Sequence, residues 1–324
     1  MSTSERLAKR AREEDVSPSE IVRSADHWLE DGSIVLQVES TQFRVTKSTL
    51  AKYSTVFQDM LSLPLPPDEP LVEGCPLVII SGDSPSDWKH LLDTMQPNCK
   101  RFFMAEYPPL EQVRSVLRLS KKYEMVLLRQ SAVDLLRSEY PTGLEDYHER
   151  MSKEVCRYDP ASVVSVARET GVPSVLPGAF YLLSIYASVQ MYDDEANDPD
   201  VPSDLSPEDQ ALCAKGQNRL FHFSLQRTLQ WFASESGRIP GSSCPTKSAC
   251  RLVASRRLKS RLETMASMTA ASASWDESIA LGFCQNCTAE YKSCFTDARK
   301  EVWEKMPSYF GLPPWEELLR MDLE

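Results

Sequence analysis

The apolar residues near the start of this 324-residue chain change their spacing at one point, and that change limits the fold more than any other feature. Residues 33–38 read SIVLQV, a short run with β-branched residues that indicates a strand. Phe43 and Val45 alternate with polar residues, so they predict a second strand that pairs with the first as a hairpin. From Lys47 onward the apolar residues recur at intervals of three and four, which indicates a helix capped by Ser48. The apolar face of this helix comprises Leu50, Tyr53, Val56, Phe57, Met60 and Leu61.

The elements that follow keep this mixed character before the pattern becomes purely helical. Residues 77–80 (LVII) predict a further strand, and Ser84-Pro85 begins a helix with Trp88 on its apolar face. Residues 110–140 read as two helices. Helical patterns also cover residues 160–170, 174–187, 217–234 and 296–304. We therefore predict an α+β N-terminal domain, a small sheet flanked by helices, followed by a mostly helical C-terminal domain.

Changes in composition divide the chain into five predicted parts. The first residues are polar and read as a flexible tail, whereas two clusters of acids and of cysteines mark the second half. The parts are a tail at 1–24, the α+β domain at 25–140, a helical extension at 141–190, an acidic loop at 191–212, and a helical region with the cysteines at 213–324.

Charge and cysteine content exclude several classes of protein. Eight acids between Tyr192 and Gln210 account for most of the net charge of −11, so the rest of the surface favours neither broad acidity nor nucleic-acid binding. No apolar run reaches the roughly 18 residues of a membrane span, and residues 1–15 lack the apolar core of a secretory leader. Nine cysteines, an odd number, argue against a disulfide framework. We expect a protein of the cytoplasm or nucleus that does not act on membranes.

Four separated segments of the first half resemble the BTB/POZ domain family, in the family's order. They are residues 31–38 (DGSIVLQV), 43–47 (FRVTK), 50–61 (LAKYSTVFQDML) and 116–123 (VLRLSKKY). The resemblance covers about residues 27–140. The whole chain, including its tryptophan-containing C-terminal end, is similar to the BTB-containing proteins abundant in mushroom-forming fungi.

The resemblance implies a protein–protein interaction module and no enzyme. Family members form homodimers, and some serve as substrate adaptors on cullin-type ubiquitin-ligase scaffolds, others as transcriptional regulators that act with co-regulators. The sequence agrees with a non-catalytic role, because no metal-protease, serine-hydrolase or P-loop motif occurs in it. The apolar residues Val22, Trp28 and Leu29 lie near the start of the domain, where such dimers often pack.

Five cysteines gather in the last quarter of the chain. Cys284 and Cys287 form a CxxC pair, and Cys244 and Cys250 form a looser pair upstream. Thiolates bind zinc tetrahedrally, so these four predict one closed structural zinc site, with Cys294 as the reserve ligand if Cys250 points away. Two other interpretations stay open: the four are reduced core thiols, or the CxxC pair is a redox site, although no thioredoxin-like strand and helix surround it.

Two further segments have a structural and a functional interpretation. The basic stretch 251–261 is either a solvated helix face or, together with the cysteine site, a contact for nucleic acid or another partner; its few aromatic residues favour the first. Residues 307–315 (PSYFGLPPW) are either a tail docked on the second domain or a peptide for a partner. We expect the docked tail.

Overall fold

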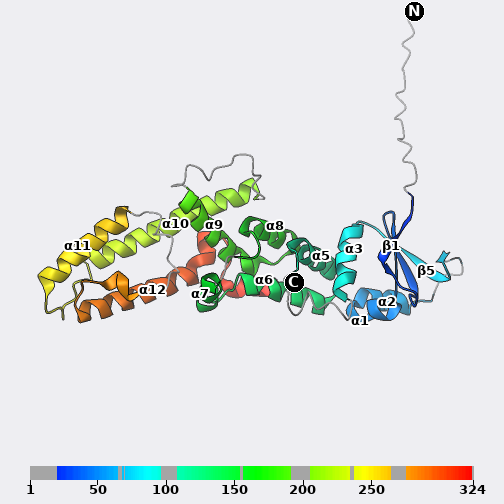
Figure 1. Ribbon diagram of the computed structural model, residues 1–324, viewed down its shortest axis with the longest axis horizontal. Helices are drawn as coiled ribbons and strands as arrows, with labels where there is room; N and C mark the ends of the chain where they lie inside the picture. The colour runs from blue at the N-terminus through cyan, green and yellow to red at the C-terminus, as the bar shows by residue number, and fades with distance from the viewer. Residues whose placement is uncertain are drawn as a thin grey trace, which may run out of the picture. The chain divides into compact units, whose positions relative to one another are not determined.

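The computed structural model describes residues 20–64, 68, 70–95, 108–153, 156–190, 205–233, 237–263 and 275–322. The chain divides into two compact units (Figure 1). The first unit comprises Met1–Pro108 and Lys122–Met125, and the second comprises Pro109–Lys121 and Val126–Glu324.

The first unit is built on a five-stranded mixed sheet with the strand order β1-β3-β2-β5-β4. The strands are β1 (Val22–Trp28), β2 (Ile34–Val38), β3 (Thr41–Val45), β4 (Leu71–Val72) and β5 (Cys75–Ile80). Strands β2 and β3 form the predicted antiparallel hairpin, in which Leu36 pairs with Phe43. Strand β5 runs parallel to β2 and extends the sheet. Because β2 is central, its apolar residues are buried on both faces.

Helices α1 (Lys47–Tyr53), α2 (Thr55–Ser62) and α3 (Pro85–Met95) belong to the same unit. The single helix that the sequence predicts after Lys47 is two helices, because Ser54 leaves the helical conformation and caps α2. Its hydroxyl accepts a hydrogen bond from the Phe57 N–H at 3.0 Å and donates one to the Tyr123 carbonyl at 2.6 Å. The predicted cap Ser48 is wrong: Thr46 precedes α1.

An aromatic cluster forms the centre of this unit. The ring centroid of Phe57 lies 5.9 Å from that of Trp88 and 5.1 Å from that of Tyr123. Asp83 accepts hydrogen bonds from the Trp88 indole N–H at 3.0 Å and the Tyr123 hydroxyl at 2.5 Å. Burial raises the pKa of Tyr123 and keeps its phenol protonated as the donor. The polar ends of both rings are thereby satisfied inside the core.

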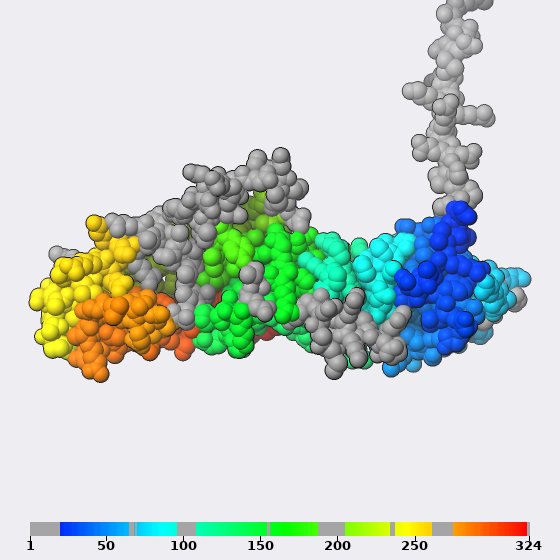
Figure 2. All heavy atoms as spheres, viewed as in Figure 1, coloured from blue at the N-terminus to red at the C-terminus, as the bar shows by residue number. Residues whose placement is uncertain are grey.

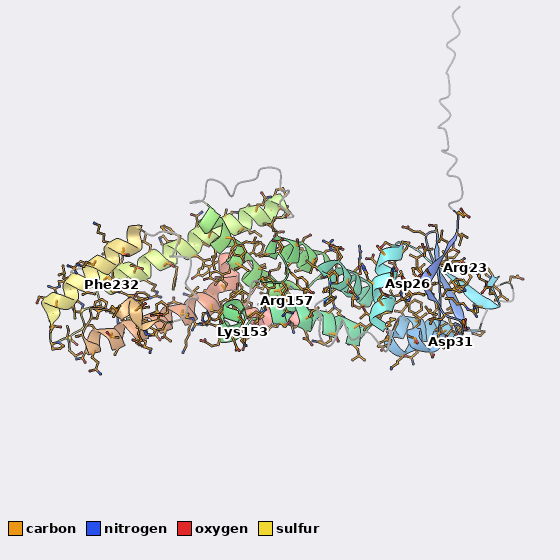
Figure 3. The ribbon with its side chains drawn as sticks, in the orientation of Figure 1. Arg23, Asp26, Asp31, Lys153, Arg157 and Phe232 are labelled. Atoms are coloured by element: carbon orange, nitrogen blue, oxygen red, sulfur yellow. The ribbon has the colours of Figure 1, made fainter. Side chains whose placement is uncertain are left out.

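Strands β1 and β4 are elements that the sequence did not predict. Strand β1 begins at Val22, inside the predicted tail, and runs parallel to β3. Two ion pairs hold it to the unit: Arg23 contacts Glu73 at 2.6 Å, and Asp26 contacts Lys89 at 2.5 Å (Figure 3 labels Arg23 and Asp26). The Lys89 ammonium, which donates a hydrogen bond to Asp26, lowers the pKa of that carboxyl.

The second unit is helical. Its α-helices are α5 (Leu110–Lys122, of which the last residue belongs to the first unit), α6 (Val126–Glu139), α7 (Leu144–Lys153), α8 (Pro160–Thr170), α9 (Leu176–Gln190), α10 (Pro207–Phe232), α11 (Lys247–Glu263), α12 (Gln285–Tyr309) and α13 (Trp315–Met321). Two short 3₁₀ helices, Pro173–Val175 and Glu277–Ala280, precede α9 and α12. The predicted mixed domain followed by a helical region is confirmed.

Helices α10 and α12 are longer than their sequence patterns indicate. Helix α10 begins at Pro207 rather than near Gln217, with Ser206 as its N-cap. The last part of the predicted acidic loop is therefore helical, and Asp209 forms an ion pair with Arg168 at 2.9 Å. Acids in a first helical turn are favourable because the helix dipole is positive there. Most of the loop, residues 191–204, lies outside the described residues.

The C-terminal segment docks on the second unit, as predicted. Phe310 is fully buried and stacks on Phe180 with 5.3 Å between ring centroids. The Trp315 ring stacks on Trp303 at 5.5 Å, and its indole N–H donates a hydrogen bond to the Trp303 carbonyl at 2.9 Å. The large apolar side chains of this segment thus complete the core of the helical unit.

Gly216 permits a close approach between α10 and the end of α12. A Cβ atom at this position would lie 2.0 Å from Cε1 of the buried Phe310 ring. Glycine to alanine in a helix normally stabilises by about 1 kcal/mol. Here we expect the opposite sign: Gly216→Ala should lower the free energy of unfolding by about 1–3 kcal/mol through overpacking. Urea denaturation of the variant and the wild type tests this, and a stabilised variant would contradict it.

Within the described residues, no helix has the length and apolar character that crossing a membrane requires.

A candidate four-cysteine metal centre

The four predicted cysteines come together at the start of two helices of the second unit. Cys244 lies in the loop before α11, and Cys250 lies in the first turn of that helix. Cys284 is the N-cap residue of α12, and Cys287 lies in its first turn. Figure 2 shows α11 (yellow) beside the beginning of α12 (orange). Two loop–helix corners thus supply two sulfurs each.

The sulfur positions match the geometry of a tetrahedral ion. All four Sγ atoms lie within 4.8 Å of one another, and those of Cys244 and Cys284 are 3.6 Å apart. A zinc–sulfur bond of about 2.3 Å places the sulfurs of a tetrahedral site about 3.8 Å apart. The arrangement could therefore hold a metal ion after small side-chain adjustments. Cys250 points toward the group, so the reserve ligand Cys294 is not needed there.

The surroundings shift the pKa values of three of these thiols, and not all in the same direction. The Cys287 backbone N–H donates a hydrogen bond to the Cys284 sulfur and is the main cause that lowers the Cys284 pKa to about 7. Burial raises the pKa values of Cys244 and Cys287. Thiolates at helix N-termini are stabilised by the positive end of the helix dipole. The Cys284 thiol is thus ready to lose its proton near neutral pH, whereas Cys244 and Cys287 would do so only beside a cation.

Backbone and side-chain hydrogen bonds hold the two corners in register. The Cys284 backbone N–H donates to the Cys250 sulfur at 3.3 Å. The side-chain amide of Asn286 donates to the Ser243 carbonyl at 2.7 Å and so ties the CxxC turn to the other loop. Asn286 is a positioning residue that the sequence analysis missed, although it stands between the two cysteines of the pair.

The cysteines pack in a small core that consists largely of aromatic residues. Cys244, Cys250 and Cys287 are buried in the same cluster as Phe232 and Tyr291, whose ring centroids are 5.1 Å apart. Figure 3 labels Phe232 at the end of α10. The cluster consists largely of aromatic residues, alanines and cysteines, so it offers less aliphatic packing than an ordinary helical core. A bound ion would therefore add substantially to the stability of this end of the unit.

The four sulfurs form a closed donor set. A tetrahedral zinc ion with four thiolates has no open position for water or substrate, so such a site stabilises structure and performs no chemistry on a substrate.

The remaining cysteine of the region, Cys294, is buried, and its sulfur lies 4.0 Å from a Glu290 carboxylate oxygen.

Three basic residues of α11 are placed by the structure, either in solvent or against a neighbouring element. Arg257 donates a hydrogen bond to the Ser278 carbonyl at 3.1 Å and joins α11 to the 3₁₀ helix before α12. Arg251 and Arg256 are exposed. The structure therefore agrees with the solvated helix face that the sequence favours for residues 251–261. The side chain of residue 261 lies outside the described residues.

The first unit offers a second candidate surface at the edge of its sheet. Strand β1 is the last strand in the sheet order, so one of its edges has no strand beside it among the described residues. Ile21 and Val22 are more than half exposed there, and Leu29 just after the strand is 37% exposed. An exposed edge strand with apolar neighbours is a typical place for association with another chain.

Comparison with known families identifies the N-terminal third of the chain. Residues 30–139 match the family model of the BTB/POZ domain. The chain contains a BTB/POZ domain. The match runs from just before β2 to the end of α6, so the BTB/POZ domain includes helices that pack in the second unit. Strand β1 precedes the matched residues, and the four cysteines lie well beyond them. No curated protein matches the chain.

A BTB/POZ domain is a protein–protein interaction module, and this establishes the coarse function of the N-terminal part. The predicted family is thereby confirmed for residues 30–139.

Proposed function

We propose that this protein is a scaffold that self-associates through its BTB/POZ domain and presents a zinc-stabilised helical region to a second protein. The observation that carries the proposal is the BTB/POZ match, because domains of this family commonly dimerise and bind other proteins. The exposed edge of β1, with Ile21, Val22 and Leu29, supports association there. We also propose that the protein acts in the cytoplasm or nucleus.

Within this role we propose an adaptor function. The BTB/POZ domain would contact a cullin-type ligase scaffold or a transcriptional co-regulator, and the helical region would contact the substrate or regulated protein. The mostly helical region of about 185 residues beyond the matched segment supports the idea, because a bare dimerisation domain would not need it. Copurification from the native host tests this: a cullin or a transcriptional co-regulator should copurify with residues 20–140 intact and not when the BTB/POZ domain is deleted.

Self-association makes a quantitative prediction. Light scattering of the purified chain at tens of micromolar should give twice the monomer mass of 36.6 kDa. A Val22→Glu variant should shift the population toward monomer, because a stable interface of about 1,600 Å² rarely tolerates a buried unpaired charge. Glu30→Lys, an exposed change near the same edge, serves as the control. A wild-type monomer would contradict the prediction.

We further propose that the ion in the cysteine centre is zinc. Four thiolates at tetrahedral distances favour zinc over calcium or magnesium, which prefer oxygen ligands. Elemental analysis of protein purified without chelator should find one zinc per chain. If the purified chain contains almost no zinc, the proposal is wrong and the four cysteines are ordinary core thiols.

A further inference from the structure

A surface cleft lies between α10 and α12, away from the cysteine centre and outside the residues that match the BTB/POZ domain. Its volume is about 500 Å³. Helix α10 packs against α12 in Figure 1. The cleft is lined by Asn218, Arg219, His222, Phe223 and Gln226 of α10 and by Lys305, Ser308 and Tyr309 of α12. A volume of this size matches small-molecule sites and exceeds what a bare ion fills.

The lining provides hydrogen-bond donors and positive charge. Arg219, His222 and Gln226 follow one another at intervals of three and four along one stripe of α10, and Lys305 lines the cleft from α12. None of the eight lining residues is an acid. Glu301 lies nearby, but it accepts hydrogen bonds from both Lys305 and Arg227, so this trio retains one net positive charge.

Several of these donors are not used by the protein. Among the described residues, the side chains of His222 and Gln226 make no hydrogen bond. Arg219 directs one nitrogen at the Ser308 and Tyr309 carbonyls, at 3.0 and 2.8 Å, which fixes the guanidinium at the cleft and leaves its other N–H groups available. A rigidly held cation with spare donors is suited to an oxyanion.

The remaining wall is aromatic. The Phe223 and Tyr309 rings line the cleft with their centroids 6.3 Å apart. Burial raises the pKa of Tyr309 to about 12, so its phenol adds no negative charge at neutral pH. A ligand with a flat ring could lie against these two side chains while its anionic group meets Arg219 and Lys305.

We propose that this cleft binds an organic phosphate monoester that carries a flat ring, held by Arg219, His222 and Lys305 at the phosphate and by Phe223 and Tyr309 at the ring. A phosphate monoester has nearly two negative charges and three acceptor oxygens at neutral pH. Two cations and several neutral donors match that group better than a carboxylate, which has one charge and two oxygens.

Calorimetric titration of the full chain with phenyl phosphate tests the proposal. We expect saturable binding, and we expect inorganic phosphate, which lacks the ring, to bind about tenfold more weakly, a difference of about 1.4 kcal/mol. Benzoate and phenol, which lack the phosphate, should bind more weakly still. Absence of saturable binding of phenyl phosphate, or equal binding of benzoate, would overturn the proposal.

Matched variants locate the binding. Lys305→Met and His222→Ala should each weaken phenyl phosphate binding about tenfold, as expected for loss of one charge-assisted hydrogen bond. Lys300→Met removes an exposed lysine of the same helix that does not line the cleft, so it should leave the affinity within about twofold. Thermal melting of each variant establishes that it is folded. Equal weakening by Lys300→Met would show nonspecific charge attraction and contradict the site.

Discussion

The double substitution Cys284→Ser/Cys287→Ser should remove zinc from the protein and lower the melting temperature of the helical unit by about 10 °C or more. Structural zinc binds cysteine sites of small domains with an apparent free energy of about 10–16 kcal/mol, and that binding energy becomes folding energy. In a unit of this size each kcal/mol corresponds to about 2–4 °C. Even partial compensation by the aromatic cluster around Phe232 leaves a large loss.

Calorimetry beside elemental analysis measures both parts of this result. Chelator treatment of the wild type should reproduce the shift and leave the transition of the first unit in place. Cys213→Ser is the matched control, because that cysteine lies on α10 outside the four-sulfur group. A double variant that melts like the wild type would show that the four cysteines are packing residues.

Phe57→Ala should cost about 3–5 kcal/mol of the free energy of unfolding, enough to unfold a marginal domain. Phe57 is 1% exposed and contacts both Trp88 and Tyr123, so its removal leaves a cavity in the middle of the aromatic cluster. Urea denaturation monitored by tryptophan fluorescence measures the loss. An unchanged denaturation midpoint would contradict the assignment of this core.

Val56→Ala provides the comparison within the same helix. The sequence places Val56 and Phe57 on one apolar face, yet Val56 is 37% exposed. Its truncation should change the stability by about 0.5 kcal/mol or less. Equal effects of the two substitutions would show that the break at Ser54, which turns α2 relative to α1, is misplaced.

That break illustrates what sequence reasoning could not predict. The hairpin of β2 and β3 follows from local alternation, and the pairing of Leu36 with Phe43 agrees with it. The interruption at Ser54 depends on the carbonyl of Tyr123, 69 residues away. Local periodicity contains no information about such a partner, so a continuous helix was the natural prediction.

Strand β1 was missed for a related reason. Its sequence, VRSADHW, is mostly polar, and its hydrogen bonds come from parallel pairing with β3. Parallel pairing joins segments that no hairpin turn connects, so turn signals give no warning of it. The ion pairs of Arg23 and Asp26 likewise involve residues far along the chain.

The proximity of the four cysteines was predictable, because their residue type and spacing are those of a thiolate metal site. The five residues between Cys244 and Cys250 look too many for a tight turn, but three of them lie in the first turn of α11, which brings Cys250 back toward the loop. What the sequence could not indicate is that both pairs occupy helix starts. That placement depends on how α11 and α12 pack.

The proposed zinc site also implies an order of events during translation. Cys250 and Cys284 are 34 positions apart, so at a synthesis rate of about 5–20 residues per second the second pair is made about 2 to 7 seconds after the first. Two sulfurs alone hold zinc poorly, and the ion can be enclosed only when the first turn of α12 has left the ribosome. If the site holds zinc as we propose, metal loading would be a late event in synthesis, and zinc supply would determine which finished molecules have this end of the helical unit closed.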